Sequence, residues 1–323
     1  MRILITGAAG NLGALLASHL LRTTPETLRL MVHRRDVPRE LREAGTRVEI
    51  IRADLRKKET LRPALEKVDV VVHFAGILFQ ARPERFLPET NLGYFKNLVD
   101  VALECGVKKV VLISFPHVEG PTSVENPARG RMDVTPISVH AKTRLEEEKH
   151  LFGKIETPVS LRVGMVYGDG ILMIDAARWL ARRRLLGVWR EQTQIHLISK
   201  IDFCEATTRA LLNPDVKGIY HLGDEGNVSL QEFLKIACEA WRTPPPWIMP
   251  LWMIYAAATA CECFSAVFST KSPLTRDFID IGRVSYYGDT TRMRRELQPE
   301  LHYPTILDGR ETLVKTGLLN GER

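Results

Sequence analysis

Three glycines near the N-terminus have the spacing of a phosphate-binding turn. The segment Gly7-Ala8-Ala9-Gly10-Asn11-Leu12-Gly13 follows a short apolar run, residues 2–6, and precedes a helical pattern of leucines. Glycine lacks a Cβ, so Gly7 can make a tight turn, Gly10 can let the backbone approach a pyrophosphate, and Gly13 can let the helix lie close to the strand. The first amides of the helix add partial positive charge. Strand, glycine turn and helix in this order predict a dinucleotide site, although G-x-x-G-x-x-G differs from the more familiar G-x-G-x-x-G.

Strands and helices alternate through the first half of the chain, which predicts a parallel sheet covered by helices on both faces. Right-handed crossovers would place the ligand beyond the carboxyl ends of the strands, where Gly7, Asp54, Ala75 and Ser114 fall. The predicted fold is α/β, with a Rossmann-type doubly wound parallel sheet over residues 1–170 and a returning strand near 218–223. A smaller, mostly helical C-terminal substrate cap is expected over residues 171–323. The further strands are expected at residues 28–32, 48–51, 68–73, 109–114 and 159–163, and helices at 94–105 and 138–151.

An apolar segment in the C-terminal part, residues 250–268, carries a single charge, Glu262. Its length is marginal for a membrane span. The first interpretation is a buried cap helix over an apolar pocket. The second is a helix that docks on a membrane surface, which would make the protein peripheral to the membrane. The apolar pocket would use the large side chains of the cap, Trp247, Trp252, Met253, Tyr255, Phe264 and Phe268.

Composition narrows the class of protein. The 323 residues include 45 Lys and Arg against 39 Asp and Glu, a net charge of +6. A basic balance suits an enzyme that binds a dinucleotide phosphate, and without a basic stripe interleaved with aromatics no nucleic acid is expected as a partner. The five cysteines are scattered and odd in number, which predicts a reduced, cytoplasmic protein without a disulfide framework or a metal site. The apolar run at the N-terminus is too short for a signal peptide.

Five motifs occur in order along the chain: Thr6-Gly7-x-x-Gly10-x-x-Gly13, Ala53-Asp54-Leu55, His73-Phe74-Ala75-Gly76, Asn91 and Leu161-Arg162-Val163-Gly164-Met165-Val166-Tyr167-Gly168. Together they resemble the short-chain dehydrogenase/reductase superfamily, in its extended or atypical branch, over about residues 1–225. The remainder loosely resembles the cap of 3β-hydroxysteroid-dehydrogenase-like members. The resemblance implies a pyrophosphate site, an adenine site and a site for the nicotinamide-side ribose and phosphate. These would be formed, in that order, by Gly7, Gly10, Asn11, Leu12 and Gly13, by Asp54 and Leu55, and by Phe74, Ala75 and Gly76.

The end of the second strand distinguishes the two nicotinamide cofactors. An acidic residue there binds the ribose 2′-hydroxyl, whereas a cation accommodates a 2′-phosphate. This chain has Val32-His33-Arg34-Arg35, with no acid before Asp36. Arg34 can form bidentate bonds with a phosphate and stack on the adenine. We therefore predict NADP(H), with His33 and Arg34 in the cofactor site. NAD(H) is the alternative, with the arginines on a solvated loop.

The resemblance also implies three catalytic positions: a tyrosine, a lysine four residues later, and a serine near the end of the fifth strand. Here His140 and Arg144 stand in the first two, on one helical face, and Phe115 stands at the third, beside Ser114. Arg144 can hold the ribose hydroxyls and contribute a charge, and His140 can donate a proton or orient a substrate. A shifted register would offer Ser138 and Lys142 instead. His117 and His196 are further pocket candidates.

The leading prediction is an NADPH-dependent oxidoreductase that reduces a carbonyl or activated double bond of a hydrophobic small molecule. His140, Arg144 and Ser114 would be its catalytic residues. One alternative is a nicotinamide-dependent epimerase or dehydratase. The other is a non-catalytic protein that binds NADP(H), acting as a redox sensor or an assembly subunit. Members of the superfamily often form homodimers through the helices that flank the fifth strand, so a homodimer is also expected.

Overall fold

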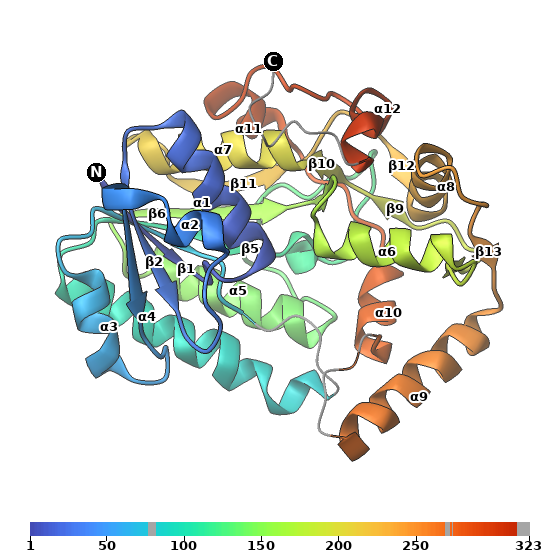
Figure 1. Cartoon of the computed structure of the whole chain (residues 1–323), viewed down its shortest axis with the longest axis horizontal. Helices are drawn as coiled ribbons and strands as arrows, with labels where there is room; N and C mark the ends of the chain where they lie inside the picture. The colour runs from blue at the N-terminus through green and yellow to red at the C-terminus, as the bar shows by residue number, and fades with distance from the viewer. Residues whose placement is uncertain (77–81, 269–271, 273, 315–323) are drawn as a thin grey trace.

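Seven parallel strands form one sheet in the order β11-β6-β5-β4-β1-β2-β3 (Figure 1). The computed structural model describes residues 1–76, 82–268, 272 and 274–314. Strand order reverses between β1 and β4, the point where ligands bind in sheets of this kind. The predicted doubly wound parallel sheet is therefore confirmed. The strands are β1 (Arg2–Thr6), β2 (Thr27–Val32), β3 (Val48–Arg52), β4 (Val70–His73), β5 (Lys109–Ser114), β6 (Thr157–Val163) and β11 (Gly218–Leu222).

Helices cover both faces of the sheet, which explains why the centre of β1 is apolar on both of its sides. Ile3 and Ile5 join a buried cluster with Leu16 of α1 (Asn11–Thr23) and Phe203 of α7 (Lys200–Leu212). Leu4 points the other way, because alternate side chains of a strand face opposite sides, and joins the cluster under the helices of the second face. A strand buried on both faces needs apolar residues at every position. The helices of the second face are α3 (Lys58–Leu65), α4 (Tyr94–Glu104) and α5 (Val139–Phe152).

The chain leaves the seven-stranded sheet after β6 and rejoins it at β11. Helix α7 packs beside α1, and β11 pairs in parallel with β6, from Gly218 opposite Val159 to Leu222 opposite Val163. The sheet therefore includes the strand expected near residues 218–223. The remaining elements are α2 (Arg39–Arg42), β7 (Met165–Tyr167), α6 (Leu172–Arg182), β8 (Gly187–Val188), β9 (Gln194–Ile195), β10 (Leu197–Ser199), β12 (Val228–Ser229), α8 (Leu230–Ala240), β13 (Trp247–Ile248), α9 (Leu251–Phe268), α10 (Arg276–Gly282), α11 (Thr291–Glu296) and α12 (Ile306–Gly309).

Helix α9 lies at the edge of the molecule, away from the sheet (Figure 1). The predicted buried cap helix over an apolar pocket is wrong, because only one stripe of α9 packs against the protein. A helix that is apolar all round gives no sign in its sequence of which stripe will pack. In the part of the chain that the structure describes, no helix is long and apolar enough to cross a membrane. The cap side chains Trp247, Trp252, Met253 and Phe264 are exposed, Tyr255 is half-buried, and the Phe268 side chain lies outside the described residues.

Candidate dinucleotide and catalytic site

The glycine turn is packed too tightly for side chains. Gly7 directly follows β1 with φ +69°, and a Cβ there would lie 2.9 Å from the backbone nitrogen of Ala75. A Cβ on Gly13 would lie 2.5 Å from the carbonyl oxygen of Gly7. That carbonyl accepts a hydrogen bond from the amide of Gly10 at 2.8 Å. The turn therefore brings the end of β1, the start of α1 and the segment after β4 into direct backbone contact.

The N-terminus of α1 is left open toward this turn. Gly10 is the N-cap residue and has no side chain to bond the amides of the first turn. The Asn11 side chain does not bond these amides either. Its Nδ2 donates a hydrogen bond to the carbonyl of Gly170 at 2.6 Å, and its Oδ1 accepts one from the amide of Leu172 at 3.0 Å. Asn11 thus ties the turn to the start of α6. The first-turn amides, which no residue of the helix can bond, fit a pyrophosphate.

Cations surround the predicted adenine end. Asp54 accepts hydrogen bonds from Arg56, and these hold the pKa of its carboxyl at about 2. His33 Nε2 lies 3.5 Å from the same carboxylate, and Asp36 pairs with Arg42 at 3.3 Å. Both acids near the ends of β2 and β3 are therefore engaged. Arg34 is exposed and has no hydrogen bond or ion pair with any described residue.

Leu55 and Phe74 contribute mainly to packing. Leu55 packs against the cluster beneath α3 and α4, and its carbonyl accepts a hydrogen bond from Asn97 at 3.0 Å. Phe74 packs against the opposite cluster, with its ring 6.3 Å from that of Phe203 in an edge-on arrangement. Their backbones nevertheless lie at the carboxyl ends of β3 and β4, the edge where a dinucleotide would bind.

At the nicotinamide end, Gly76 makes room for a cation. A Cβ on Gly76 would lie 2.5 Å from a guanidinium nitrogen of Arg144, so the glycine lets Arg144 reach the segment after β4. Arg144 also pairs with Glu147, one turn further along α5, at 2.5 Å. Both side chains are buried, and burial raises the pKa of Glu147 although Arg144 opposes this. The structure thus places Arg144 beside the segment predicted to bind the nicotinamide-side ribose.

His140 lies in the first turn of α5, with 1% of its surface exposed. Its ring meets that of Phe115 edge-on, with centroids 4.5 Å apart. Neither ring nitrogen has a hydrogen-bond partner among the described residues. Burial, with help from the charge of Arg144, lowers the pKa of His140 to about 3. The imidazole is therefore neutral near pH 7, able to donate one hydrogen bond and accept another, but not to act as an imidazolium acid.

The shifted register with Ser138 and Lys142 finds no support. The Ser138 hydroxyl caps α5 by accepting a hydrogen bond from the amide of Ala141 at 3.1 Å. Lys142 is exposed on the far side of the helix from the buried His140 and Arg144. His196 is also engaged, with Nε2 2.8 Å from the carbonyl of Asp224 and Nδ1 accepting from Gly288 at 3.1 Å.

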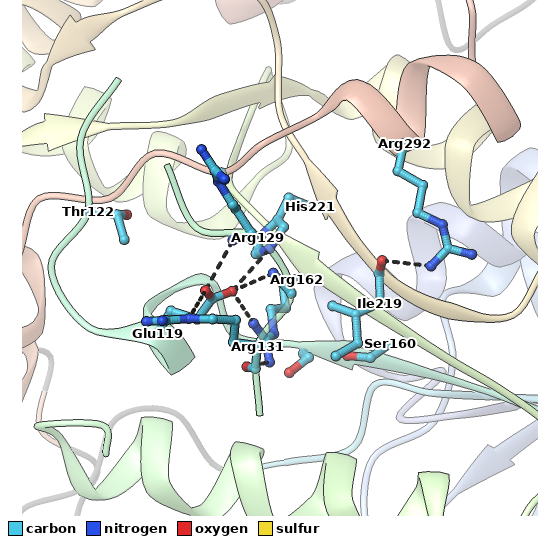
Figure 2. A network of polar contacts seen from close by, with 12 residues as sticks. Glu119, Thr122, Arg129, Arg131, Ser160, Arg162, Ile219, His221 and Arg292 are labelled. Carbon is cyan, nitrogen blue, oxygen red and sulfur yellow. Dashed lines mark hydrogen bonds and ion pairs between the residues drawn. The ribbon is translucent and has the colours of Figure 1, made fainter. Parts of the chain in front are cut away.

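Ser114 belongs to a buried ion network behind the site. Its hydroxyl donates a hydrogen bond to Glu148 at 2.6 Å, and the same carboxylate accepts a hydrogen bond from the Arg162 guanidinium at 2.6 Å. Figure 2 shows the other half of the network, in which Glu119 binds Arg162 at 2.6 Å and faces His221 at 3.3 Å. These contacts turn the Ser114 hydroxyl toward Glu148 and give it a structural role. Its catalytic role stays a prediction.

Two groups at the site escaped the sequence prediction. Glu147 is one, although its spacing of three residues from Arg144 in a helix is a signal for a pair. The other is Tyr286, which extends the row formed by Phe115 and His117: the centroids of Phe115 and His117 lie 4.9 Å apart, and those of His117 and Tyr286 lie 5.5 Å apart. His117 bonds the carbonyl of Val284 through Nε2 at 3.0 Å. Tyr286 comes from a distant part of the cap, and no local pattern predicts its place.

A separate hollow in the described structure lies away from this site. It measures about 400 Å³ and lies between residues 103–108 and 152–156. Those residues precede β5 and β6, so the hollow is at the amino ends of the strands, opposite to the glycine turn. Ligands of such sheets bind at the carboxyl ends.

The chain is similar to known proteins. A family model described as "NAD dependent epimerase/dehydratase family" matches residues 3–223. The chain belongs to this family. The solved structures that resemble this chain include UDP-glucose 4-epimerase of Thermus thermophilus in complex with NAD. That structure has a TM-score of 0.75 and 20% identity and covers 100% of both chains. UDP-glucuronic acid 4-epimerase of Bacillus cereus with NAD has a TM-score of 0.73 and 18% identity over 97% of both chains. At these identities the likeness shows the fold.

Curated relatives match part of this chain. A uronate dehydrogenase of Pseudomonas syringae pv. tomato is 28% identical over 220 residues, 67% of this chain and 71% of the relative. One of Pseudomonas putida is 34% identical over 119 residues, 37% of this chain and 42% of the relative. Methionine adenosyltransferase 2 subunit beta of Mus musculus is 21% identical over 266 residues, 77% and 75% of the two chains. The chain thus spans less than half the length of the Pseudomonas putida relative and a larger share of the other two.

Proposed function

We propose that this protein is an NADP(H)-dependent oxidoreductase that reduces a carbonyl or an activated double bond of an apolar small molecule. The observation that carries the proposal is His140, a neutral and buried imidazole whose two nitrogens have no partner among the described residues. A buried polar group in a native protein normally has a hydrogen-bond partner, and a substrate oxygen would supply one. The neighbouring rings of Phe115 and His117 favour an apolar or planar substrate.

Each part of the site then has a task. The N-terminus of α1 and the backbone of the glycine turn bind the pyrophosphate, and Arg34 binds the 2′-phosphate of the adenosine ribose. Arg144 holds the hydroxyls of the nicotinamide ribose, with Glu147 fixing the direction of its guanidinium. When bound, the nicotinamide supplies the hydride. The N–H of the neutral His140 donates a hydrogen bond to the substrate oxygen and so orients the substrate, and the proton that completes the reduction comes from water.

The cofactor preference is tested by calorimetric titration with NADPH and then NADH. We expect NADPH to bind more tightly, and Arg34→Ala to weaken NADPH by about tenfold to a hundredfold, because charge-assisted bonds to the 2′-phosphate are lost. Affinity for NADH should stay the same. Arg39→Ala, which removes an exposed arginine paired with Glu43 on α2, is the control and should change neither affinity. Equal binding of both nucleotides by the unmodified protein would contradict the NADP(H) preference.

The role of His140 is tested in a screen of apolar carbonyl and enone compounds for NADPH oxidation. We expect His140→Ala to lower the turnover of an accepted substrate by about a hundredfold, the scale on which one hydrogen-bond donor to the reacting oxygen contributes. NADPH affinity should be unchanged. Lys142→Ala, an exposed change on the same helix, should leave turnover intact. Turnover that survives His140→Ala would show that the imidazole does not serve the reaction.

A second candidate is a non-catalytic subunit that binds NADP(H). Arg144 and Glu147 favour it, because a cation already paired at 2.5 Å in a buried site is less available to a reacting group. A relative is itself named as a subunit of another enzyme, methionine adenosyltransferase 2. Such a protein would bind NADPH, oxidise none of it with any compound in the screen, and be indifferent to His140→Ala. Interconversion of a bound sugar without net oxidation of NADPH would instead support an epimerase, as in the similar solved structures.

A further inference from the structure

One face of α9 is exposed, apolar and free of charge. Trp252 is 70% exposed, Phe264 58% and Val267 76%, values unusual for large apolar side chains. The only charged residue of the helix, Glu262, is turned toward α10, where it pairs with Arg276 at 2.9 Å. We call the exposed side the outer face of α9. It consists of Trp252, Met253, Ala256, Ala257, Thr259, Ala260, Cys263, Phe264, Ala266 and Val267.

The inner side of α9 fixes this orientation. Leu251, Ile254 and Tyr255 pack against the main hydrophobic cluster, and Ala258 is fully buried within it. The Tyr255 hydroxyl also bonds Asp280 of α10. These positions recur every three or four residues, as a packed helical stripe does. The inner side therefore holds α9 against the protein and leaves the outer face largely exposed.

The apolar surface continues beyond α9. Strand β13, just before the helix, exposes Trp247 and Ile248. It pairs with β8, and the amide of Trp247 bonds the carbonyl of Leu186 at 2.9 Å. Leu185, next to that carbonyl, is 61% exposed. Figure 1 shows β13, the end of α6 and the start of α9 at the same edge of the molecule.

Three cations lie beside this surface. Arg182 is the last residue of α6, Arg183 and Arg184 follow it immediately before Leu185, and all three are exposed. None of them forms an ion pair with an acidic group in the described part of the chain. The Arg183 guanidinium stacks on Trp179 at 3.9 Å from the ring centroid. Arginine and tryptophan side by side at the border of an apolar surface suit the headgroup region of a bilayer, where both have an apolar body and a polar tip.

We propose that the outer face of α9 docks in the plane of a membrane surface that contains anionic lipids, with Arg182, Arg183 and Arg184 on the lipid phosphates. The chemistry of the face favours lipid over another protein. Protein interfaces carry about one hydrogen bond per 100–200 Å². The single hydroxyl on this face, that of Thr259, already donates to the carbonyl of Tyr255 at 2.8 Å. The arginines supply the charge that complements an anionic surface.

Flotation of the full-length protein with vesicles tests the proposal. The two vesicle types are pure phosphatidylcholine and phosphatidylcholine with about 30% phosphatidylglycerol. We expect binding to the anionic vesicles to be about tenfold stronger and to fall at high salt, because surface charges are screened. A triple variant, Trp252→Ser with Phe264→Ser and Val267→Ser, should lose binding to both types. Arg183→Glu with Arg184→Glu should lose only the advantage of the anionic vesicles.

Matched substitutions elsewhere serve as controls. Leu307→Ser on α12 and Leu103→Ser on α4 remove exposed apolar side chains, 62% and 48% exposed, from other parts of the surface and should not change binding. Unchanged NADPH affinity shows that each variant is folded. The proposal is overturned if the protein binds neither vesicle type, or if the triple variant binds as well as the parent. A dimer in sedimentation that the triple variant abolishes, without vesicle binding, would overturn it in favour of a second copy of the chain.

Discussion

Replacing Arg162 with methionine should lower the free energy of unfolding by about 3–5 kcal/mol, the loss expected when one partner of a buried ion pair is removed. Arg162 has no exposed surface, and its guanidinium joins Glu119 and Glu148, each at 2.6 Å (Figure 2). Methionine would fill much of the space of the arginine stem. It would leave two buried carboxylates without their shared cation. The destabilisation is therefore electrostatic and should be visible in urea unfolding.

The same substitution should change how stability depends on pH. Burial alone would raise the pKa of Glu119, but the close approach of His221 at 3.3 Å, the hydrogen bond from the Arg129 amide and the charge of Arg162 hold it at about 2. A carboxyl whose pKa is lowered by folding stabilises the protein above its unfolded value, and this stability is lost as pH falls toward 2. Without Arg162, burial should raise the pKa of the Glu119 carboxyl. The deficit of the variant should then shrink as pH falls from about 8 to about 5.

Arg131→Met is the matched control for Arg162→Met. Arg131 also approaches Glu119, at 3.6 Å, but 64% of its side chain is exposed. An exposed pair of this kind contributes only about 0–1 kcal/mol, so the control should be nearly as stable as the parent at every pH. Equal destabilisation by both substitutions would mean that burial is not what makes Arg162 important. A deficit that grows as pH falls would contradict the proposed origin in two unpaired carboxylates.

The parts of the fold that local chemistry dictates could be predicted. The three central residues of β1, Ile3, Leu4 and Ile5, are all apolar because both faces of the sheet are covered. The glycine turn that follows β1 has an order that specifies a turn and a helix. The spacing of four residues predicted that His140 and Arg144 share one face of α5, and the structure shows that both side chains are buried. In each case the deciding contacts lie within a few residues of one another or follow a fixed period.

The rest depends on contacts between distant residues. Arg162 binds Glu119 and Glu148, which come from different elements, and His221 joins them from β11. Tertiary pairing of this kind leaves no local pattern. The prediction that α9 is buried was wrong for a related reason. The sequence of a helix with no polar stripe does not indicate whether other parts of the protein cover it. Ser114 illustrates a third limit: its place at the end of β5 was predicted, but only the structure shows that its hydroxyl turns to Glu148.

Gly7→Ala should weaken NADPH binding by about a hundredfold through displacement of the phosphate-binding turn. Two costs combine at this position. Alanine at φ +69° is strained, by about 1–2 kcal/mol. The new Cβ would also lie 2.9 Å from the backbone nitrogen of Ala75 and 3.1 Å from the carbonyl carbon of Phe74. Neither atom can move alone, so the turn must separate from the segment after β4, and the two ends of the cofactor site move apart.

Gly45→Ala separates these two costs. Gly45 has φ +77°, yet a Cβ there would meet no atom within 4 Å. The control therefore carries the backbone strain without the collision, and should lose about 1–2 kcal/mol of stability with unchanged NADPH affinity. Calorimetry for affinity and urea unfolding for stability, applied to both variants, measure the two effects apart. If Gly7→Ala is as destabilised as Gly45→Ala and still binds NADPH like the parent, the close approach of Gly7 to Ala75 is not what shapes the cofactor site, and the pyrophosphate must be bound elsewhere.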